Sequence, residues 1–291
     1  MKLLNFGSLN IDYVYQVNHI VEAGETESSI KRDIHPGGKG LNQSVAIARA
    51  GGEVYHAGKI GTDGIMLVDL CKTSKVHTDF IKIADVPTGH TIIQVDRTGQ
   101  NSIILYGGAN RCIDENFVDE VLSHFSQNDI ILLQNEISCL SYIVEKAYQK
   151  GMRIVLNPSP FDERVNDIDF SKISMFIINE VEGRQITGAS YPDKIIETMK
   201  RKYPDATAIL TVGADGSWYW KGDVQYRQDA VHVNAVDTTA AGDTFTGYFL
   251  ACAIAGKDVQ ESLAIASKAA AVAVTREGAI PSIPWMDEIV K

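Results

Sequence analysis

Short apolar segments alternate with helical patterns along most of this chain. Runs rich in valine, isoleucine and leucine predict strands at residues 3–6, 130–133, 154–156, 175–178 and 208–211. Apolar spacing predicts helices at residues 42–50, 65–74, 141–150, 195–202 and 243–255. Strands that are apolar on both faces and separated by helices are typical of a parallel sheet with right-handed crossovers. The alternation therefore predicts an α/β fold of three layers with a mostly parallel central sheet, whose ligands bind beyond the carboxyl ends of the strands.

Two stretches interrupt this alternation. Residues 13–35 alternate in polarity without a long helix, and the runs 91–95 and 102–106 flank the turn sequence 96–101, which is a hairpin signal. Together they predict a small antiparallel sheet outside the main one, with segments near 13–35 and 88–107; surface decoration is the alternative. Because no long polar linker divides the 291 residues, we expect a single domain over 1–291.

Composition limits the possible partners and locations. The formal net charge of -10 argues against broad binding to nucleic acids or anionic membranes, although it permits ATP. The first residues are too few for a secretory segment, and the longest apolar stretches are too short for a membrane span, so we expect a cytoplasmic protein. The four cysteines show no Cys-x-x-Cys spacing, which argues against a zinc site and a disulfide framework.

The run 236–245 combines small residues with a carboxylate just before a predicted helix. If Asp243 opens that helix, the N–H groups of Ala240, Ala241, Gly242 and Asp243 meet the positive end of the helix dipole and can hold negative charge. A carboxylate at this point can take a proton from an attacking hydroxyl. The alternative is an Asp N-cap on an ordinary helix.

This run resembles the C-terminal signature of the ribokinase-type carbohydrate kinases. Residues 36–44, Pro-Gly-Gly-Lys-Gly-Leu-Asn-Gln-Ser, resemble the N-terminal Gly-Gly signature of that family in the form typical of ribokinases. Further correspondences at 7–12, 134–136, 156–158, 179–182 and 211–216 follow in family order, so the resemblance covers essentially the whole chain. It implies a three-layer ribokinase-like fold in which the small sheet is a lid over the sugar and often forms a homodimer contact.

Residues expected to contact a sugar gather near the first signature. Sugar hydroxyls need side chains that donate and accept hydrogen bonds, and Asn10 and Asp12, two residues apart, point the same way. The resemblance implies sugar contacts at Asn10, Asp12, Gly38, Lys39, Asn42, Glu136 and Asp243. Each alone could be a cap or turn former, and Lys39 could be a solvated charge. His90 and Asn135 stand near lid and sugar positions where smaller or apolar residues are expected, which suggests an altered pocket.

The nucleotide side of the site is implied mainly by the resemblance, because the P-loop and Rossmann glycine patterns are both absent. Acidic residues in the run 179–182 could order the water shell of Mg²⁺, or could simply suit a helix N-terminus. The run 211–216 reads as a strand ending in a glycine-rich turn. Ser267 stands where ribokinases often have His. The implied nucleotide contacts are Asn179, Glu182, Thr211, Gly213, Ala214, Asp215, Gly216, Gly242 and Ser267.

The resemblance also implies a K⁺ site beside the anion cradle. Its members would be Asp237, Thr239, Ala273, Arg276, Gly278 and Ser282, mostly through backbone carbonyl oxygens. The alternative is that the segment around Gly278 is only the end of a helix, terminated by glycine and kept from continuing by Pro281.

Together these features predict an ATP-dependent kinase of a small sugar, most simply one that converts D-ribose to ribose 5-phosphate at the primary hydroxyl. Asp243 would take the proton, the amides of residues 240–242 would stabilise the transferring phosphoryl group, and Mg²⁺ would bridge the nucleotide phosphates. The alternatives are a kinase of another pentose, a nucleoside or fructose, and a non-catalytic sugar sensor on the same fold.

Overall fold

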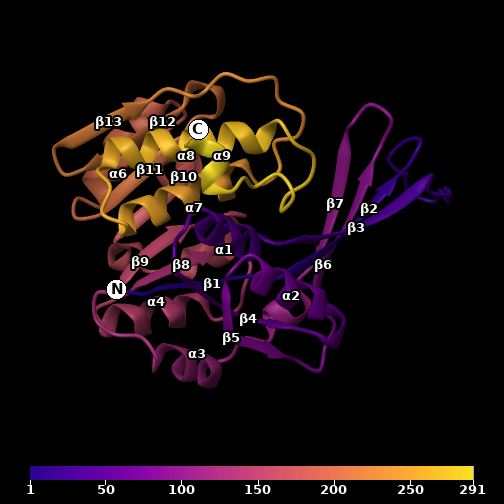
Figure 1. The fold of residues 1–291 in the computed structure, drawn as a ribbon, viewed down its shortest axis with the longest axis horizontal. Coiled ribbons are helices and arrows are strands. Elements are labelled where there is room, and N and C mark those ends of the chain that lie inside the picture. The colour runs from indigo at the N-terminus through magenta and orange to yellow at the C-terminus, as the bar shows by residue number, and fades with distance from the viewer. Residues whose placement is uncertain (291) are drawn as a thin grey trace.

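The computed structural model describes residues 1–290, which form two sheets of unequal size with helices on both faces of the larger one (Figure 1). In spatial order, the strands of the large sheet are β13 (Val224–Gln228), β12 (Ser217–Lys221), β11 (Thr207–Thr211), β10 (Met175–Asn179), β9 (Arg153–Asn157), β8 (Ile130–Gln134), β1 (Leu3–Phe6), β4 (Val54–Ile60) and β5 (His77–Ile83). Neighbours from β5 to β11 pair in parallel, while β12 and β13 are antiparallel. The predicted α/β fold with a mostly parallel sheet is therefore confirmed.

The helices pack in two layers, one on each face of the large sheet, because the side chains along each strand point alternately to the two faces. They are α1 (Lys39–Arg49), α2 (Ile65–Thr73), α3 (Glu115–Leu122), α4 (Leu140–Gln149), α5 (Glu180–Thr187), α6 (Pro192–Lys202), α7 (Ala241–Ile254), α8 (Val259–Val274) and α9 (Met286–Ile289). Apolar residues of α3 to α6 form one core with one face of the sheet, and those of α1, α2, α7 and α8 form a second core with the other. Within residues 1–290, no helix is both long and apolar enough to cross a bilayer.

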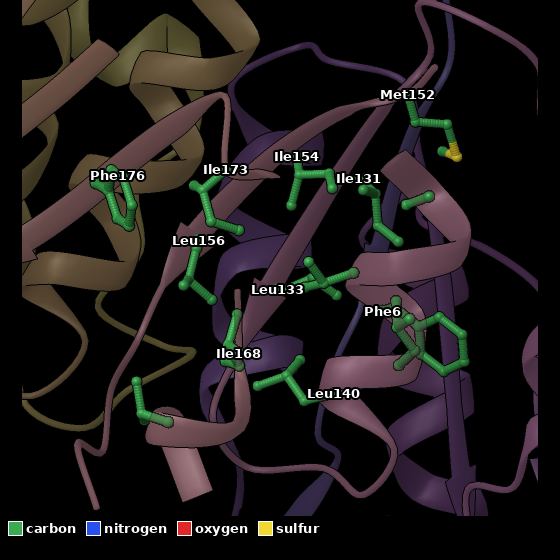
Figure 2. Close-up of a cluster of buried hydrophobic side chains, with 14 of the residues drawn as sticks. Phe6, Ile131, Leu133, Leu140, Met152, Ile154, Leu156, Ile168, Ile173 and Phe176 are labelled. Atoms are coloured by element: carbon green, nitrogen blue, oxygen red, sulfur yellow. The ribbon is translucent and has the colours of Figure 1, made fainter. Parts of the chain in front are cut away.

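Successive residues of the central strands enter opposite cores, as expected for side chains that alternate across a sheet. Leu133, Ile154, Leu156 and Phe176 lie in the core formed with α3 to α6 (Figure 2), whereas Val155 lies in the core formed with α1, α2, α7 and α8. This double burial explains why the strands read as continuous apolar runs.

The small sheet projects from one side of the body and contains β3 (Lys31–Gly37), β2 (Asn10–Gln16), β6 (Gly89–Val95) and β7 (Asn101–Tyr106), in that spatial order (Figure 1). We call it the lid sheet. Its two hairpins, β2–β3 and β6–β7, are antiparallel as predicted. The central pair β2–β6 is parallel, because both strands leave the body in the same direction.

Candidate active site

Two adjoining cavities lie at the carboxyl ends of the strands, beside the start of α7. The first, about 210 Å³, is lined by Lys39, Asn157, Ser159, Ile177, Ile178, Asn179, Glu182, Thr211, Thr238, Ala240, Ala241, Gly242, Asp243 and Thr246. The second, about 370 Å³, shares Thr211, Thr238, Ala241 and Gly242 with it. A larger cavity of about 710 Å³ lies at the opposite edge of the sheet, at Ile130 and Arg153, and contains none of the predicted site residues. We assign the site by its chemistry and not by its size.

The start of α7 differs from the sequence prediction. The helix begins at Ala241, so Asp243 is its third residue and does not open it. Ala240 holds the N-cap position with a left-handed backbone (φ 59°) and no side-chain cap, which excludes Asp243 as the N-cap. The Ala241 N–H donates a long hydrogen bond of 3.3 Å to the Thr238 carbonyl. The N–H groups of Gly242 and Asp243 have no acceptor within the helix, so they remain as the core of the predicted anion cradle.

Space for a ligand exists directly above this cradle. A Cβ placed on Gly242 would meet no atom within 4 Å, so its backbone faces an open cavity. The helix dipole favours negative charge at the same place. The first turn of α7 can therefore hold an anionic group such as a phosphoryl.

Asp243 is buried, with 5% of its surface exposed, and both of its oxygens are held by side chains of α1. Asn42 Nδ2 donates to Oδ2 at 3.0 Å, and Gln43 Nε2 donates to Oδ1 at 2.8 Å. Sequence reasoning missed Gln43, although it stands next to Asn42 in the first signature. The charge of Asp243 is the largest cause that raises the pKa of Lys39, and Glu136 acts in the same direction against burial. A carboxylate fixed in this way, in a cavity beside a cation, can act as a general base.

Three further sugar-contact candidates meet at the foot of the lid sheet. The Glu136 carboxylate accepts hydrogen bonds from the Ser8 hydroxyl and, at 2.9 Å, from the Lys39 N–H, and burial raises its pKa. Gly38 takes a positive φ of 95° at the N-cap of α1, where an added Cβ would lie 3.1 Å from the Asn10 N atom. This close approach places β2 against the start of α1.

Asn10 and Asp12 lie in the first half of β2, where they share one face of the lid sheet. Asn10 Oδ1 accepts a hydrogen bond from Asn110 Nδ2 at 2.7 Å. Asp12 Oδ1 accepts one from the Thr91 hydroxyl at 2.6 Å. Burial raises the pKa of Asp12 against the opposing effect of that hydrogen bond. The structure thus brings these two side chains to the lid, while Lys39, Asn42 and Asp243 lie in the body.

The two residues expected to alter the sugar pocket have other positions. His90 pairs with Ile11 and so lies on the opposite face of the lid sheet from Asp12. Its ring packs against Tyr13 and Tyr106, with centroids 5.8 and 4.9 Å away. Asn135 Nδ2 donates to the Pro160 carbonyl and to Asp162 Oδ1, so it shapes the loop after β9.

The second cavity gathers most of the predicted nucleotide contacts. Its walls include Thr211, Gly213, Ala214, Gly216, Gly242 and Ser267, whereas Asp215 is not among the lining residues. The rest of the lining was not predicted, because neither the segment 230–235 nor α8 carries a recognisable binding motif at these positions. These missed residues are Ala230, Val231, His232, Val233 and Ala235, with Ala270, Ala271 and Val274 of α8.

Asn179 and Glu182 form a capping box at the start of α5. Asn179 Oδ1 accepts the Glu182 N–H at 2.9 Å, and Glu182 Oε2 accepts the Asn179 N–H at 3.0 Å. Both residues also line the first cavity, and Glu182 is only 4% exposed. Glu182 therefore helps to cap α5, and its charge lies close to any ligand in the first cavity.

The proposed cation positions lie on two segments, one just before α7 and one at and after the end of α8, which a hydrogen bond connects. Asp237 Oδ1 accepts from the Thr239 N–H and hydroxyl, and Oδ2 accepts the Gly278 N–H at 2.9 Å. Burial would raise the pKa of Asp237, but these hydrogen bonds outweigh it and lower the pKa below its usual value. Ser282 donates to the Ala279 carbonyl, and the Arg276 side chain pairs with Glu288. Residues 1–290 contain no group of three or more His, Cys, Asp or Glu that could hold a metal ion. Any cation here would depend on the single carboxylate of Asp237 together with backbone and hydroxyl oxygens.

The Ala273 carbonyl accepts the Arg276 N–H at 3.0 Å, so two of the predicted cation positions are joined by a backbone hydrogen bond. A carbonyl oxygen has two lone pairs, and this bond uses one of them.

Comparison with known proteins agrees with this geometry. Residues 1–286 match the family described as pfkB family carbohydrate kinase. A ribokinase from Haemophilus influenzae is 33% identical, over 98% of this chain and 96% of that protein. A ribokinase structure from Cryptococcus neoformans in complex with ADP is 32% identical, with a TM-score of 0.86 over 99% of this chain and 98% of that one. An Arabidopsis thaliana ribokinase complexed with ribose and ATP is 28% identical, with a TM-score of 0.88 over 99% and 97% of the two chains.

The match covers both cavities, the lid sheet and the start of α7. The chain therefore belongs to the pfkB family of carbohydrate kinases, phosphotransferases whose acceptor is an alcohol group.

Proposed function

We propose that this protein transfers the γ-phosphoryl group of ATP to the primary hydroxyl of a small sugar, with D-ribose as the first candidate. One observation carries the proposal: the buried Asp243 carboxylate lies in the first turn of α7, where two cavities meet. The relative solved with ribose and ATP supports both the sugar and the nucleotide.

In the proposed reaction, Asp243 accepts the proton of the sugar hydroxyl as its oxygen attacks the γ-phosphorus and the bond to ADP breaks. The N–H groups of Gly242 and Asp243 hold the charge that develops on the transferring group. Lys39 supplies a cation on the same cavity. The lid sheet, which carries Asn10 and Asp12, covers the sugar and excludes water that would otherwise hydrolyse ATP.

The residues around the first cavity fit a hydrated Mg²⁺ ion. Glu182 provides a buried carboxylate whose oxygens already accept hydrogen bonds from Asn179, and Mg²⁺ usually keeps several of its waters. We infer that Glu182 and Asn179 orient such waters. When bound, Mg²⁺ would neutralise charge on the nucleotide phosphates.

We also propose a K⁺ site at the loop of Asp237 and Gly278. The groups there are hard oxygen donors, which suits a monovalent cation, and Asp237 already ties residues 237–239 to Gly278. A bound K⁺ would add charge beside the anion cradle. A cytoplasmic location fits the use of ATP.

The lid sheet supports a proposed homodimer. Apolar side chains form a row across the four strands. Its members lie side by side in register and are Ile34 on β3, Tyr13 on β2, Ile92 on β6 and Ile104 on β7. The three isoleucines are 43%, 38% and 61% exposed. By strand alternation this row lies on the face opposite Asp12, so a second copy could pack on it without covering the sugar contacts.

The decisive experiment is a coupled ADP-release assay with pentoses, hexoses and nucleosides, using wild type and Asp243→Asn. We expect turnover with ribose and a loss of roughly 10²–10⁴-fold in the variant, the usual contribution of a general base. ADP binding, measured by calorimetry, should change little. Preference for another acceptor would reassign the substrate. Saturable sugar binding without ADP release would instead indicate the sensor, and wild-type turnover in Asp243→Asn would remove Asp243 from the reaction.

A further inference from the structure

A chain of buried amide side chains extends behind Asp243 into the centre of the sheet. Gln43 Nε2 donates to Asp243 Oδ1 at 2.8 Å and to Asn157 Oδ1 at 2.9 Å. Gln134 Nε2 donates to Gln43 Oε1 at 2.6 Å and to Asn5 Oδ1 at 2.9 Å. Asn5, Gln43 and Gln134 are fully buried. The chain therefore connects α7 with α1 and with the central strands β1, β8 and β9.

The far end of this chain is anchored by two oxygen atoms that accept hydrogen bonds from the Asn5 amide. Asn5 Nδ2 donates to the Gly40 carbonyl at 2.7 Å and to Ser44 Oγ at 2.8 Å. Ser44 in turn lies 2.7 Å from His56 Nδ1, and burial lowers the pKa of His56 to about 4. His56 is therefore neutral at pH 7, so its Nδ1 can accept the Ser44 proton. This leaves Asn5 Oδ1 facing Gln134 as an acceptor.

Each amide in the chain has one orientation that satisfies its neighbours. If the Gln43 amide turned over, its oxygen would face the Asp243 carboxylate and the Asn157 oxygen, and its NH₂ would face that of Gln134. Gln134 prevents this by donating to Gln43 Oε1, and Asn5 fixes Gln134 in the same way. The orientation of the Asn5 amide on β1 thus determines, through Gln134 and Gln43, which group faces the Asp243 carboxylate on α7. Asn42 supplies the second hydrogen bond to that carboxylate.

We infer that Gln43 is a positioning residue for Asp243, and that Gln134 acts through it by fixing the direction of the Gln43 amide. The inference rests on the proposed role of Asp243 as the base. Two neutral amides hold the two carboxylate oxygens, which fixes rotation about the Cβ–Cγ bond and directs one oxygen at the hydroxyl proton. Such orientation matters because misplacing a reacting group by about 1 Å can reduce a rate by roughly 10²-fold.

Two variants of similar volume without hydrogen-bonding groups test the inference. Gln43→Met should lower kcat by roughly 10–10²-fold, and Gln134→Met by a smaller factor, while KM for sugar and ATP stays within about twofold. Tyr248→Phe is the matched control: it also removes a fully buried hydrogen bond, of 2.7 Å to the Pro284 carbonyl, from the same helix as Asp243. We expect this control to lower the melting temperature but to retain kcat.

The pH profile of a third variant separates positioning from stability. Gln43→Glu keeps the shape but places a carboxyl group against Asp243, and like charges raise the apparent pKa of such a pair. The acid limb of kcat should therefore move to higher pH in Gln43→Glu and should not move in Tyr248→Phe. An unchanged limb, or an equal loss of kcat in Tyr248→Phe, would overturn the inference.

Crystal structures of wild type and Gln43→Met distinguish failure of this inference from failure of the proposed function. We expect the Asp243 carboxylate to rotate or to occupy several positions in the variant. An unmoved carboxylate overturns the positioning role whatever the activity. If wild type phosphorylates no acceptor yet the carboxylate moves in the variant, the proposed function fails and the positioning role stands.

Discussion

At the scale of single residues, burial of the ionised Asp12 carboxylate opposes folding, whereas the proposed sugar binding uses the same carboxylate. Burial raises its pKa above the ordinary value of 3.8, so the folded protein holds this proton to higher pH than the unfolded chain does. The ionised form therefore makes folding less favourable as the pH rises through the raised pKa. A hydroxyl donor from the sugar would compensate for the lost solvation of this carboxylate.

Asp12→Asn should consequently raise the melting temperature of the ligand-free protein at pH 7 and weaken sugar binding by roughly 10–10²-fold, the effect of losing a charged acceptor. The gain in melting temperature should shrink as the pH falls through the raised pKa of Asp12, where the Asp12 carboxyl group of wild type also becomes neutral. Thermal unfolding and calorimetry between pH 4.5 and 7 measure both effects. A stability difference that does not change with pH would contradict this account.

Sequence reasoning located the residues of the proposed base and cradle at the start of α7, but it did not predict their exact positions in the helix. Small residues before a carboxylate identified the first turn of α7. The helix starts two residues before Asp243 because Ala240 adopts a left-handed backbone, which a non-glycine residue rarely does and which no motif announces. Gln43 was missed because its partners Gln134 and Asn157 are distant in the chain and become neighbours only through strand order.

At the scale of secondary structure elements, the capping box of α5 allows the capping role of Glu182 to be tested separately from its proposed role at Mg²⁺. Glutamine also closes a capping box, so Glu182→Gln should preserve α5 while it removes the charge from the first cavity. We expect this variant to need more Mg²⁺ for half-maximal activity and to bind sugar normally. A magnesium titration that superimposes on that of wild type would exclude the metal role. Glu180→Gln, in the same first turn but outside the cavity lining, is the control.

Sequence patterns predicted β1 and β8 to β11 of the large sheet, but they missed β5, β12 and β13, and also β4. That strand, Val-Tyr-His-Ala-Gly-Lys-Ile, includes a buried histidine and a lysine whose amine bonds Asp114 at 2.9 Å. Its pairing with β1 and β5 outweighs its mixed polarity. The parallel β2–β6 pair was also not predicted, since its strands are separated in the chain by β3, α1, β4, α2 and β5.

At the scale of the whole molecule, the apolar row on the lid sheet can be tested as an interface. Ile104→Lys should convert a dimer to a monomer in sedimentation experiments, because it buries an unpaired charge between the copies. Val224→Lys is the matched control, since Val224 is exposed on β13 at the far edge of the large sheet. Equal masses for the two variants would remove the lid sheet from the interface.

The proposed cation loop can be tested on the same scale, because it joins the segment before α7 to the segment after α8. Replacing Na⁺ with K⁺ at constant ionic strength should raise kcat or ATP affinity in wild type, and Asp237→Ala should abolish the difference. Glu277→Ala removes an exposed charge from the neighbouring turn and should retain it. Identical kinetics in the two salts would contradict a K⁺ site.

The parallel pairing of β2 with β6 has a mechanical consequence. The two hairpins join side by side along Asn10 to Gln16, so the lid sheet is one continuous unit, attached to the body at one end through Asn10, Gly37, Gly89 and Tyr106. Rotation of the whole sheet about that end would move Asp12 away from Lys39 and Asp243. Entry of sugar and assembly of its proposed contacts would then be a single movement, and an open lid sheet would present only part of a binding surface.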